Sequence, residues 1–215
     1  MALTLFFHPL SSYCHKVLIA LYENETPFEP VSVNLGDPDE AAALRALWPV
    51  GKFPVVRDGA SGRVVPESSI VIEYLDRRHP GPTRFIPADP DLALETRLRD
   101  RFIDIYVHGP LQKVVDDVLR PAGSKDPLGV ERARAELARG WDMLSEAVGE
   151  GPWMMGEAFT LADCAAAPAL FYASRVLPFG AAHAPLAAYL ERVKARPSYA
   201  RVLREAEPYF GMLPI

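Results

Sequence analysis

Two adjacent serines stand where a strand gives way to a helix, a position that suits the binding of an anion. Residues Leu3–His8 alternate as a strand, and Ser11 and Ser12 then precede an apolar stripe with helical spacing. Serine is a preferred N-cap residue, and the first turn of a helix leaves N–H groups unpaired and carries about half a positive charge. A hydroxyl donor at such a helix end lowers the pKa of a thiol from about 8.5 and so favours a thiolate. We predict that Ser11 holds a bound thiolate; the simpler alternative is that Ser11 or Ser12 only caps the helix.

The elements that position these serines alternate between strand and helix. The helix after Ser11 leads to a second strand over Phe28–Val33, and together they form a βαβ unit with a right-handed crossover. The next predicted elements are a helix over Asp37–Trp48, short strands over Val55–Arg57 and Arg63–Pro66, and a helix over Ser68–Arg77. This order, β, α, β, α, β, β, α, predicts an α/β domain over residues 1–79.

A proline-rich segment separates this domain from a helical remainder. Four prolines lie between His79 and Pro90, and they cannot continue a helix, so we place a linker at residues 80–90. The helices predicted after it cover Asp91–Arg120, Val130–Val148, Leu161–Arg175, Pro185–Arg196 and Ser198 to about Glu207. Residues 91–215 are therefore predicted to form an all-helical bundle.

Composition and charge exclude several classes of partner. The formal net charge is −5 and the basic residues are scattered, which argues against nucleic acid as a partner. The two cysteines, Cys14 and Cys164, lie far apart, which argues against a disulfide framework and favours a reducing compartment. The N-terminal residues carry neither a cationic signal segment nor a membrane-spanning apolar run. We expect a cytoplasmic protein that does not enter the membrane.

The segment Ser11-Ser12-Tyr13-Cys14 is similar to the Cys-Pro-Tyr-Cys motif of glutaredoxins, with serine in place of the leading cysteine. Through this segment and the motifs below, nearly the whole chain resembles the glutathione transferases, a branch of the thioredoxin-like superfamily. The resemblance implies a thioredoxin-like N-terminal domain, an all-helical C-terminal domain, a homodimer, and glutathione as the thiol held by Ser11. We choose Ser11 over Ser12 because Ser11 is level with the first cysteine of the glutaredoxin motif.

A second motif, Pro49–Val55, resembles the family's segment before the third strand, in which the proline is cis. The resemblance implies that Lys52, Phe53 and Pro54 contact glutathione, and that the N–H and C=O of Phe53 pair with its cysteinyl moiety as an added antiparallel strand. A cis X-Pro bond costs about 1 kcal/mol; an ordinary trans proline at a strand start is the alternative. Trp48 departs from the family pattern, because many members have an asparagine before the first proline.

A third motif, Glu67-Ser68, resembles the Glu-Ser pair that opens the third helix in the family. The resemblance implies that the hydroxyl and N–H of Ser68 hold the γ-glutamyl carboxylate of glutathione at the helix N-terminus, while Glu67 pairs with its ammonium group. A capping serine beside a surface glutamate is the alternative for this motif alone. It does not explain three such sites at family spacing.

A fourth motif, Phe159–Asp163, matches the family's capping box with a hydrophobic staple. Thr160 is expected to accept a hydrogen bond from the N–H of Asp163, and the Asp163 carboxylate to accept one from the N–H of Thr160. This motif is structural. We expect its loss to cost about 1 kcal/mol of stability or more and to leave the chemistry unchanged.

The resemblance also implies a second substrate, an electrophile that reacts with glutathione, but the residues that shape its pocket follow no motif. In the family, the long helix interrupted here by Gly109-Pro110 walls the pocket for the electrophile, so Tyr106 and His108 are candidates for that wall, as is Leu10. Packing or surface exposure is the alternative for Tyr106 and His108. Cys14 either forms mixed disulfides with glutathione or is a buried thiol behind the site.

The sequence thus predicts an enzyme that binds glutathione as a thiolate and conjugates it to a hydrophobic electrophile. The five histidines show no ligand spacing, so no metal is expected. Alternative functions that use the same thiolate are a glutathione-dependent isomerase, a peroxidase and a disulfide-bond reductase. A non-catalytic glutathione-binding or stress-regulatory protein is a further alternative.

Overall fold

The computed structural model describes residues 2–149 and 151–213. The chain divides into one compact unit of Met1–Ile86 with Pro197–Phe210, and a second of Pro87–Arg196 with Gly211–Ile215. The sequence pattern alone assigns residues 91–215 to one helical domain. The structure differs in one respect, because the last helix, Pro197–Ala206, groups with the N-terminal residues.

The first unit contains a mixed four-stranded sheet. Its strands are β1 (Leu3–Phe7), β2 (Phe28–Ser32), β3 (Val55–Asp58) and β4 (Val64–Pro66). They lie in the order β2-β1-β3-β4, with β1 and β2 parallel and the other two pairs antiparallel. Pro30 lies in β2, an edge strand, where a missing N–H is tolerated. The predicted order of strands and helices is confirmed.

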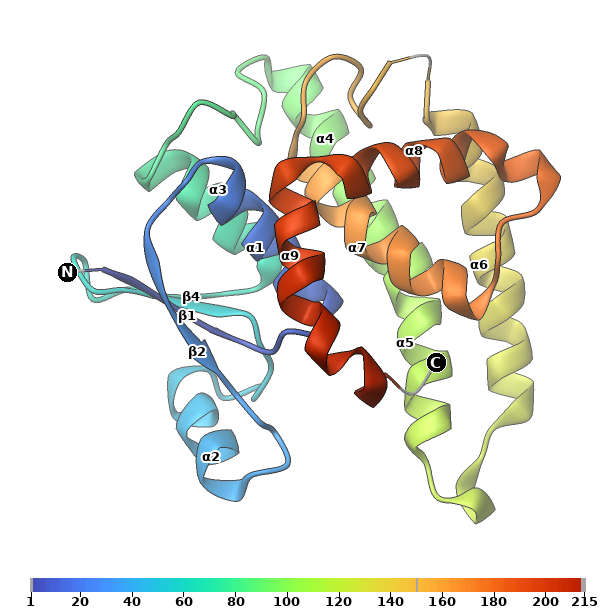
Figure 1. The fold of residues 1–215 in the computed structure, drawn as a ribbon, viewed down its shortest axis with the longest axis horizontal. Helices are drawn as coiled ribbons and strands as arrows, with labels where there is room; N and C mark the ends of the chain where they lie inside the picture. Colours follow the sequence, from blue (N-terminus) through green and yellow to red (C-terminus); the bar gives the residue numbers. More distant parts are fainter. Residues whose placement is uncertain (1, 150, 214–215) are drawn as a thin grey trace. The chain divides into compact units, whose positions relative to one another are not determined.

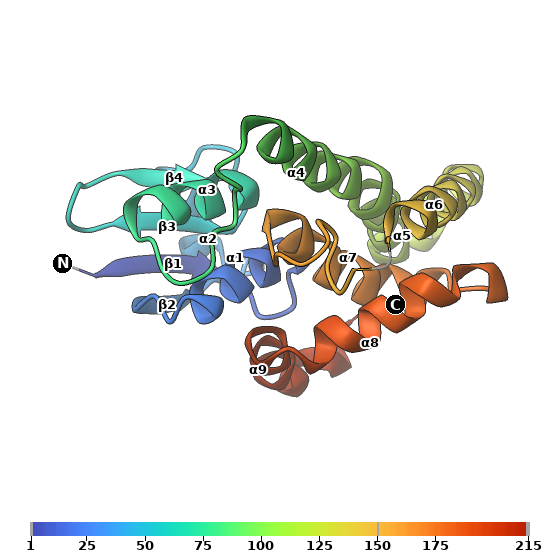
Figure 2. The ribbon, with the colours of Figure 1, turned by 90° about the horizontal axis from the view of Figure 1, so that it is seen from above.

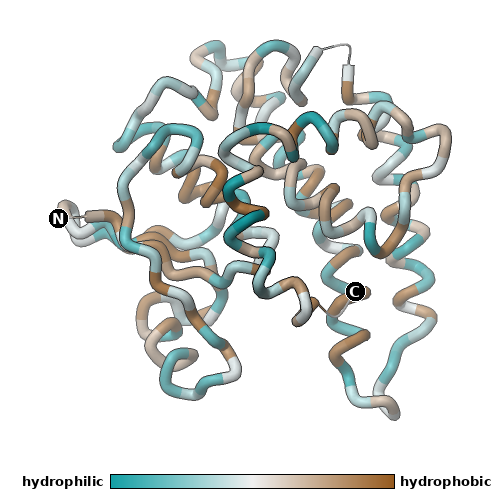
Figure 3. Tube along the Cα trace, in the orientation of Figure 1, coloured by the Kyte–Doolittle hydropathy of each residue, from teal (hydrophilic) through white to brown (hydrophobic). Residues whose placement is uncertain are grey.

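Helices cover both faces of this sheet. They are α1 (Ser12–Glu23), α2 (Pro38–Leu47) and α3 (Ser68–Arg78), and α9 (Pro197–Ala206) packs against α1. Figure 1 shows α1 and α3 on one face and α2 on the other. Alternate strand residues divide between the faces: Phe6 and Val55 pack with Leu44 of α2, whereas their neighbours Leu5 and Val56 point to the α1 and α3 side. The strands are accordingly mostly hydrophobic (brown in Figure 3).

A polar cluster joins α9 to α1. The Tyr22 hydroxyl donates to Oε2 of Glu205 at 2.5 Å, and Nε of Arg201 donates to Oε1 of the same carboxylate at 2.8 Å. The Arg201 guanidinium also lies 3.8 Å from the centre of the Tyr22 ring, a cation–π contact. These contacts explain why the last helix belongs to the first unit.

The turn between β3 and β4 is anchored to α3 by the buried carboxylate of Asp58. The Tyr74 hydroxyl donates to Oδ2 of Asp58 at 2.5 Å, and the Ala60 N–H donates to Oδ1 at 2.8 Å. His79 Nε2 lies 3.6 Å from the same Oδ2. The anchor holds the β3–β4 hairpin against the helix that begins at Ser68.

This anchor predicts a pH-dependent contribution to stability. The hydrogen bond from Tyr74, with that from Ala60, holds the pKa of Asp58 well below its ordinary value. The pKa of Asp58 is lower in the folded chain than in the unfolded chain, where it is near 4, so the ionised carboxylate stabilises the fold fully above about pH 4. This stabilisation is lost as the pH falls below about 4 and through the folded pKa. We expect Asp58→Asn to lower the urea midpoint at neutral pH and to flatten its acid dependence. Parallel pH curves for wild type and Asp58→Asn would contradict the assignment.

The second unit consists of helices. They are α4 (Pro90–Ile103), a π-helical segment (Asp104–His108), α5 (Gly109–Leu119), α6 (Pro127–Ala147), α7 (Leu161–Val176) and α8 (Ala184–Ala195). Helix α7 is buried on nearly all sides and lies among the others (Figure 2). Within the described residues, no helix has the length and apolar character needed to cross a membrane.

The helix predicted over Asp91–Arg120 is interrupted by the π-helical segment. Pro110 has no N–H to donate to the carbonyl of Tyr106, so the ordinary helical pairing cannot continue there. Gly140 of α6 faces that carbonyl, and a Cβ on Gly140 would lie only 3.0 Å from the Tyr106 oxygen. π-helical segments are commonly found where the regular hydrogen bonding of an α-helix is interrupted in this way.

The capping box at the start of α7 is confirmed. The Thr160 hydroxyl caps the helix, and the Thr160 N–H donates to Oδ2 of Asp163 at 2.9 Å. The structure adds two donors from elsewhere in the unit: the Met154 N–H at 2.7 Å and the Tyr189 hydroxyl at 2.8 Å both reach Oδ1 of Asp163. Asp163 therefore joins three segments rather than one helix end.

Candidate functional site

The turn between β1 and α1 presents Ser11 at the N-cap of the helix. The Ser11 N–H donates to the His8 carbonyl at 3.0 Å, and the Leu10 N–H donates to Nδ1 of His8 at 3.2 Å. Ser11 has the extended backbone of a cap residue, with φ −74° and ψ 119°. The prediction that a serine caps this helix is confirmed, and that serine is Ser11; Ser12 is the first helical residue.

The Ser11 hydroxyl accepts one hydrogen bond within its own helix end and keeps its hydrogen for another acceptor. Its oxygen accepts the Cys14 N–H at 3.3 Å, which leaves the hydroxyl hydrogen for another acceptor. The side chain is half-buried, and it lies at the positive end of α1. An anion at this point would therefore meet a hydroxyl donor and the helix dipole together.

His8 and two other aromatic side chains of the first unit border this turn. The His8 ring stacks on Phe53, with centroids 6.0 Å apart and an interplanar angle of 18°, and contacts Tyr209 edge-on at 6.1 Å. Burial lowers the pKa of His8 below 6.5, which favours the neutral ring that the Leu10 hydrogen bond requires. The sequence analysis considers His8 only as a possible metal ligand. Its position at the end of β1, shortly before Ser11, could have indicated that it supports this turn.

No described group of three or more His, Cys, Asp or Glu side chains could hold a metal ion.

The Phe53–Pro54 peptide bond is cis, which confirms the prediction for this segment. The Phe53 side chain packs with Trp48 against a cluster that includes Val55, while Lys52 is exposed. Gly51, just before it, has φ +68°, a conformation that glycine adopts without strain. The backbone of Phe53 therefore follows a tight turn and immediately precedes β3 in the sheet.

Glu67 and Ser68 form the start of α3. Glu67 has φ +68°, which is strained for a residue with a Cβ, and such strain is often found at functional sites. Within the described chain, its exposed side chain makes no capping hydrogen bond to α3, so that part of the helix end is left to other partners. Ser68 is buried at the first helical position. The pair thus offers a helix N-terminus to an anion and a carboxylate to a cation.

A buried cation lies beside this helix end. Nζ of Lys16, on α1, donates to Oγ of Ser69 at 3.0 Å, and the Lys16 side chain is fully buried. The ammonium also faces the Tyr13 ring at 6.0 Å from its centre. Lys16 therefore links α1 to the first turn of α3.

The three candidates for the electrophile pocket do not share one unit. Leu10 is half-buried in the turn before Ser11. Tyr106 and His108 belong to the second unit: Tyr106 is exposed and packs against Phe102 at 5.1 Å between centroids, whereas His108 is buried with Nδ1 3.3 Å from Asp104. Their role in substrate binding stays a prediction.

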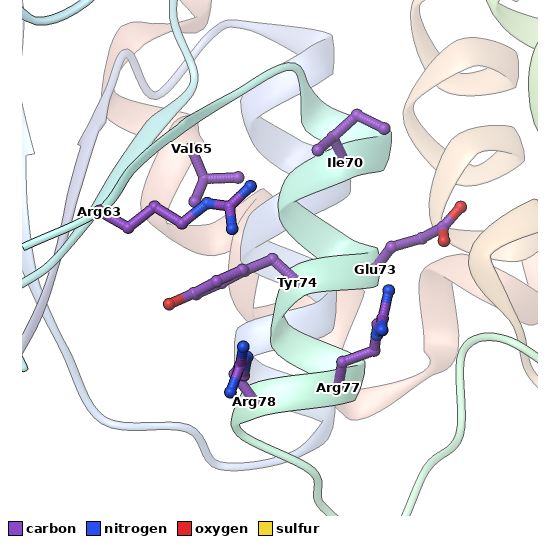
Figure 4. A pocket seen from close by; sticks show the side chains of 7 residues that line it. All are labelled: Arg63, Val65, Ile70, Glu73, Tyr74, Arg77 and Arg78. Carbon is purple, nitrogen blue, oxygen red and sulfur yellow. The ribbon is translucent and has the colours of Figure 1, made fainter. Parts of the chain in front are cut away.

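A surface groove of the first unit lies between β4 and α3, with a volume of about 280 Å³. Figure 4 shows its lining residues, which are Arg63, Val65, Ile70, Glu73, Tyr74, Arg77 and Arg78. The Arg63 guanidinium lies 5.7 Å from the centre of the Tyr74 ring. None of these residues is among those that the sequence predicts to hold glutathione.

Cys14 is fully buried, and burial raises its pKa to about 12. Since the thiolate is the reactive form, we expect native Cys14 to react with iodoacetamide more than about a hundredfold more slowly than free cysteine, and to react readily in denaturant. Cys164 is also buried and serves as an internal reference. Mass spectrometry of the labelled peptides measures both. Rapid labelling of native Cys14 would instead support a mixed-disulfide role.

Comparison with known protein families matches both parts of the chain. Residues 5–83 match the model for "Glutathione S-transferase, N-terminal domain", and residues 128–192 match "Glutathione S-transferase, C-terminal domain". A glutathione S-transferase of Pseudomonas putida is 30% identical over 72% of this chain and 67% of its own length. A stringent starvation protein A homolog of Haemophilus influenzae is 28% identical over 96% of this chain and 92% of its own.

Solved structures give the same result. A glutathione S-transferase of Methylobacterium radiotolerans, in complex with glutathione sulfonate, is 30% identical with a TM-score of 0.82, and the match covers 94% of each chain. One from Methylobacillus flagellatus with glutathione bound is 26% identical with a TM-score of 0.84, covering 94% of this chain and 98% of that one. The predicted combination of a thioredoxin-like domain and a helical domain is confirmed.

Proposed function

Because this chain belongs to the glutathione S-transferase family, we propose that it binds glutathione as a thiolate at the start of α1 and conjugates it to a hydrophobic electrophile. Attack of the sulfur on an electrophilic carbon forms a carbon–sulfur bond, and either a leaving group departs or a proton is taken up. The protein contributes a stabilised thiolate and the proximity of two bound substrates.

The observation that carries the proposal is the Ser11 cap. Its hydroxyl already accepts the Cys14 N–H, so the hydroxyl hydrogen can donate to a sulfur anion placed at the helix N-terminus. A thiolate hydrogen-bonded in this way stays anionic at a lower pH than a free thiol. Ser11 then acts as the catalytic residue, because it touches the reacting atom.

The rest of the tripeptide has matching partners in the same unit. The backbone of Phe53 would pair with the cysteinyl moiety, beside the exposed Lys52 and the cis Pro54. The buried Ser68 would hold the γ-glutamyl carboxylate at the α3 N-terminus, with Lys16 nearby, while the exposed Glu67 would pair with the ammonium group.

The direct test is a titration of the wild-type protein with glutathione at neutral pH, followed by ultraviolet thiolate absorbance. We expect an absorbance that saturates with binding. A panel of aromatic halides, hydroperoxides, a mixed disulfide of glutathione and a cis-trans diketone then identifies the second substrate. Turnover of an electrophile supports a transferase, turnover of only the diketone an isomerase, and turnover of only hydroperoxides a peroxidase. Turnover of only the disulfide would indicate a disulfide-bond reductase.

The similarity to stringent starvation protein A homologs over nearly the full length favours a second candidate, a non-catalytic regulatory protein. The same titration separates the two. A regulatory protein of this kind would show no thiolate absorbance near neutral pH and no turnover of the panel, even where calorimetry detects glutathione binding.

We also propose that two copies of the chain associate, as the family resemblance implies. Each unit has surface that a second copy would cover: the groove between β4 and α3 on the first, and a row of exposed apolar side chains, Leu94, Leu98 and Ile105, on the second. Analytical ultracentrifugation of the wild type measures the mass of the assembly, and a single-chain mass at micromolar concentration would contradict the proposal.

A further inference from the structure

A fully buried histidine lies beneath the turn that presents Ser11. His15 is in the first turns of α1 and has no exposed surface. Its Nε2 is 2.6 Å from the carbonyl oxygen of Pro9. Because a carbonyl oxygen only accepts, Nε2 of His15 carries the proton and donates it. This hydrogen bond is short and shielded from water, a setting in which its loss is costly.

His15 holds the turn at two points. Its backbone N–H donates to the Ser11 carbonyl at 2.9 Å, as the first helical hydrogen bonds require. Its side chain donates to the Pro9 carbonyl, on the other side of Leu10. His15 therefore contacts the chain at both ends of the Pro9–Ser11 segment. His8, which precedes this segment, accepts a hydrogen bond from the Leu10 N–H.

The position of the His15 ring is in turn fixed by the last helix. The Tyr199 ring of α9, also fully buried, meets the His15 ring edge-on with centroids 6.1 Å apart and an interplanar angle of 68°. Helix α9 is attached to α1 by the contacts of Tyr22 with Arg201 and Glu205. A segment near the C-terminus thereby supports the turn that carries Ser11.

We propose that His15 is a positioning residue for Ser11: its buried Nε2–H holds the Pro9 carbonyl, and so keeps the Ser11 hydroxyl where it meets the glutathione sulfur. This inference rests on the proposed function, since it assigns a role in the same site. A turn displaced by even 1 Å weakens a catalytic contact, because hydrogen bonds to a developing or resident anion depend steeply on geometry.

A histidine that merely fills space in the core makes a different prediction. In that case any side chain of similar volume would serve, and the loss of stability would be the only effect. If His15 positions the turn, the donor at the place of Nε2 matters separately from the volume. The amide of glutamine can place an N–H near that point, whereas asparagine is too short and leucine has no donor.

The experiment compares His15→Leu, His15→Asn and His15→Gln in the full chain, with Ile19→Ala as the control. Ile19 is one turn further along α1 and equally buried, so its truncation weakens the core without removing a contact to Pro9. The probe is glutathione itself. Three quantities are measured for each variant: the thiol pKa of bound glutathione from ultraviolet thiolate absorbance, its Kd by calorimetry, and the melting temperature.

We expect His15→Leu and His15→Asn to reduce the preference of the bound thiol for its anionic form roughly tenfold. His15→Gln should restore most of that preference, and Ile19→Ala should lower the melting temperature while leaving the thiol as acidic as in wild type. If His15→Leu does not fold, the comparison of the asparagine and glutamine variants decides. Equal thiol acidity in wild type, His15→Asn and any folded His15→Leu overturns the inference. A wild type without bound thiolate refutes the proposed function instead.

Discussion

Ser11→Ala is expected to raise the thiol pKa of bound glutathione by roughly one to two pH units and to lower kcat/KM about a hundredfold. The substitution removes the hydroxyl that caps α1 through the Cys14 N–H, and with it the proposed donor to the sulfur. The helix dipole and the other proposed contacts of the tripeptide remain, so glutathione should still bind. Thiolate absorbance against pH measures the first effect, and the initial rate with an electrophile found in the panel measures the second.

Two matched variants sharpen this result. Ser11→Thr keeps a hydroxyl and an accepted N-cap residue, so it should retain much of the thiolate absorbance. Ser12→Ala removes the neighbouring hydroxyl, which belongs to the first helical residue rather than to the cap, and should change the thiol pKa little. If Ser12→Ala has the larger effect, or if Ser11→Ala leaves the thiol as acidic as before, Ser11 is not the activating residue. The loss of the cap itself should cost only about 1 kcal/mol of stability.

Asp163→Ala is expected to destabilise the protein by about 4 kcal/mol, more than the loss of a helix cap alone. The buried carboxylate accepts hydrogen bonds from the N–H groups of Met154 and Thr160 and from the Tyr189 hydroxyl. Truncation leaves these buried donors without an acceptor, and each costs about 1–3 kcal/mol when unsatisfied. The urea midpoint and the melting temperature measure the effect.

Variants that remove single partners provide the control for Asp163. Thr160→Ala and Tyr189→Phe each delete one hydrogen bond to the carboxylate and leave the others, so each should cost about 1 kcal/mol. Wherever these variants are folded, the thiol pKa of bound glutathione should equal that of wild type, because the cluster belongs to the second unit. An unchanged midpoint for Asp163→Ala would show that the cluster contributes little to stability.

Several parts of the fold and of the site could be predicted because they depend on hydrogen bonds between residues that are close in the sequence. A serine before an apolar helical stripe, a Glu-Ser pair at a helix start and a Thr-x-x-Asp box each specify a helix end within a few residues. In the structure, Ser11 and Thr160 cap their helices and Ser68 is the first residue of α3. The cis bond at Pro54 was inferred from resemblance, and the structure confirms it.

Other parts depend on which residues distant in the sequence come together. The long helix predicted over Asp91–Arg120 becomes two helices around a π-helical segment, with Gly140 of another helix facing the Tyr106 carbonyl. The sequence predicts the interruption at Gly109-Pro110, because proline cannot continue the helical hydrogen bonds, but the helical period does not show that the interruption is a π-helical segment. In the same way, no pattern near Asp163 shows that the hydroxyl of Tyr189 reaches its carboxylate.

Three properties follow from the amino-acid sequence alone: the order of strands and helices, the helix end at Ser11 and the family to which these motifs point. Those properties depend on the spacing of apolar residues and on hydrogen bonds between near neighbours. The folded chain is needed to show that α9 packs with the first unit, that His8 contacts Phe53 and Tyr209, and that His15 and Lys16 donate hydrogen bonds to Pro9 and Ser69. The reason is that a buried polar side chain takes its partner from whatever the fold brings within hydrogen-bond distance, and sequence spacing carries no information about that distance.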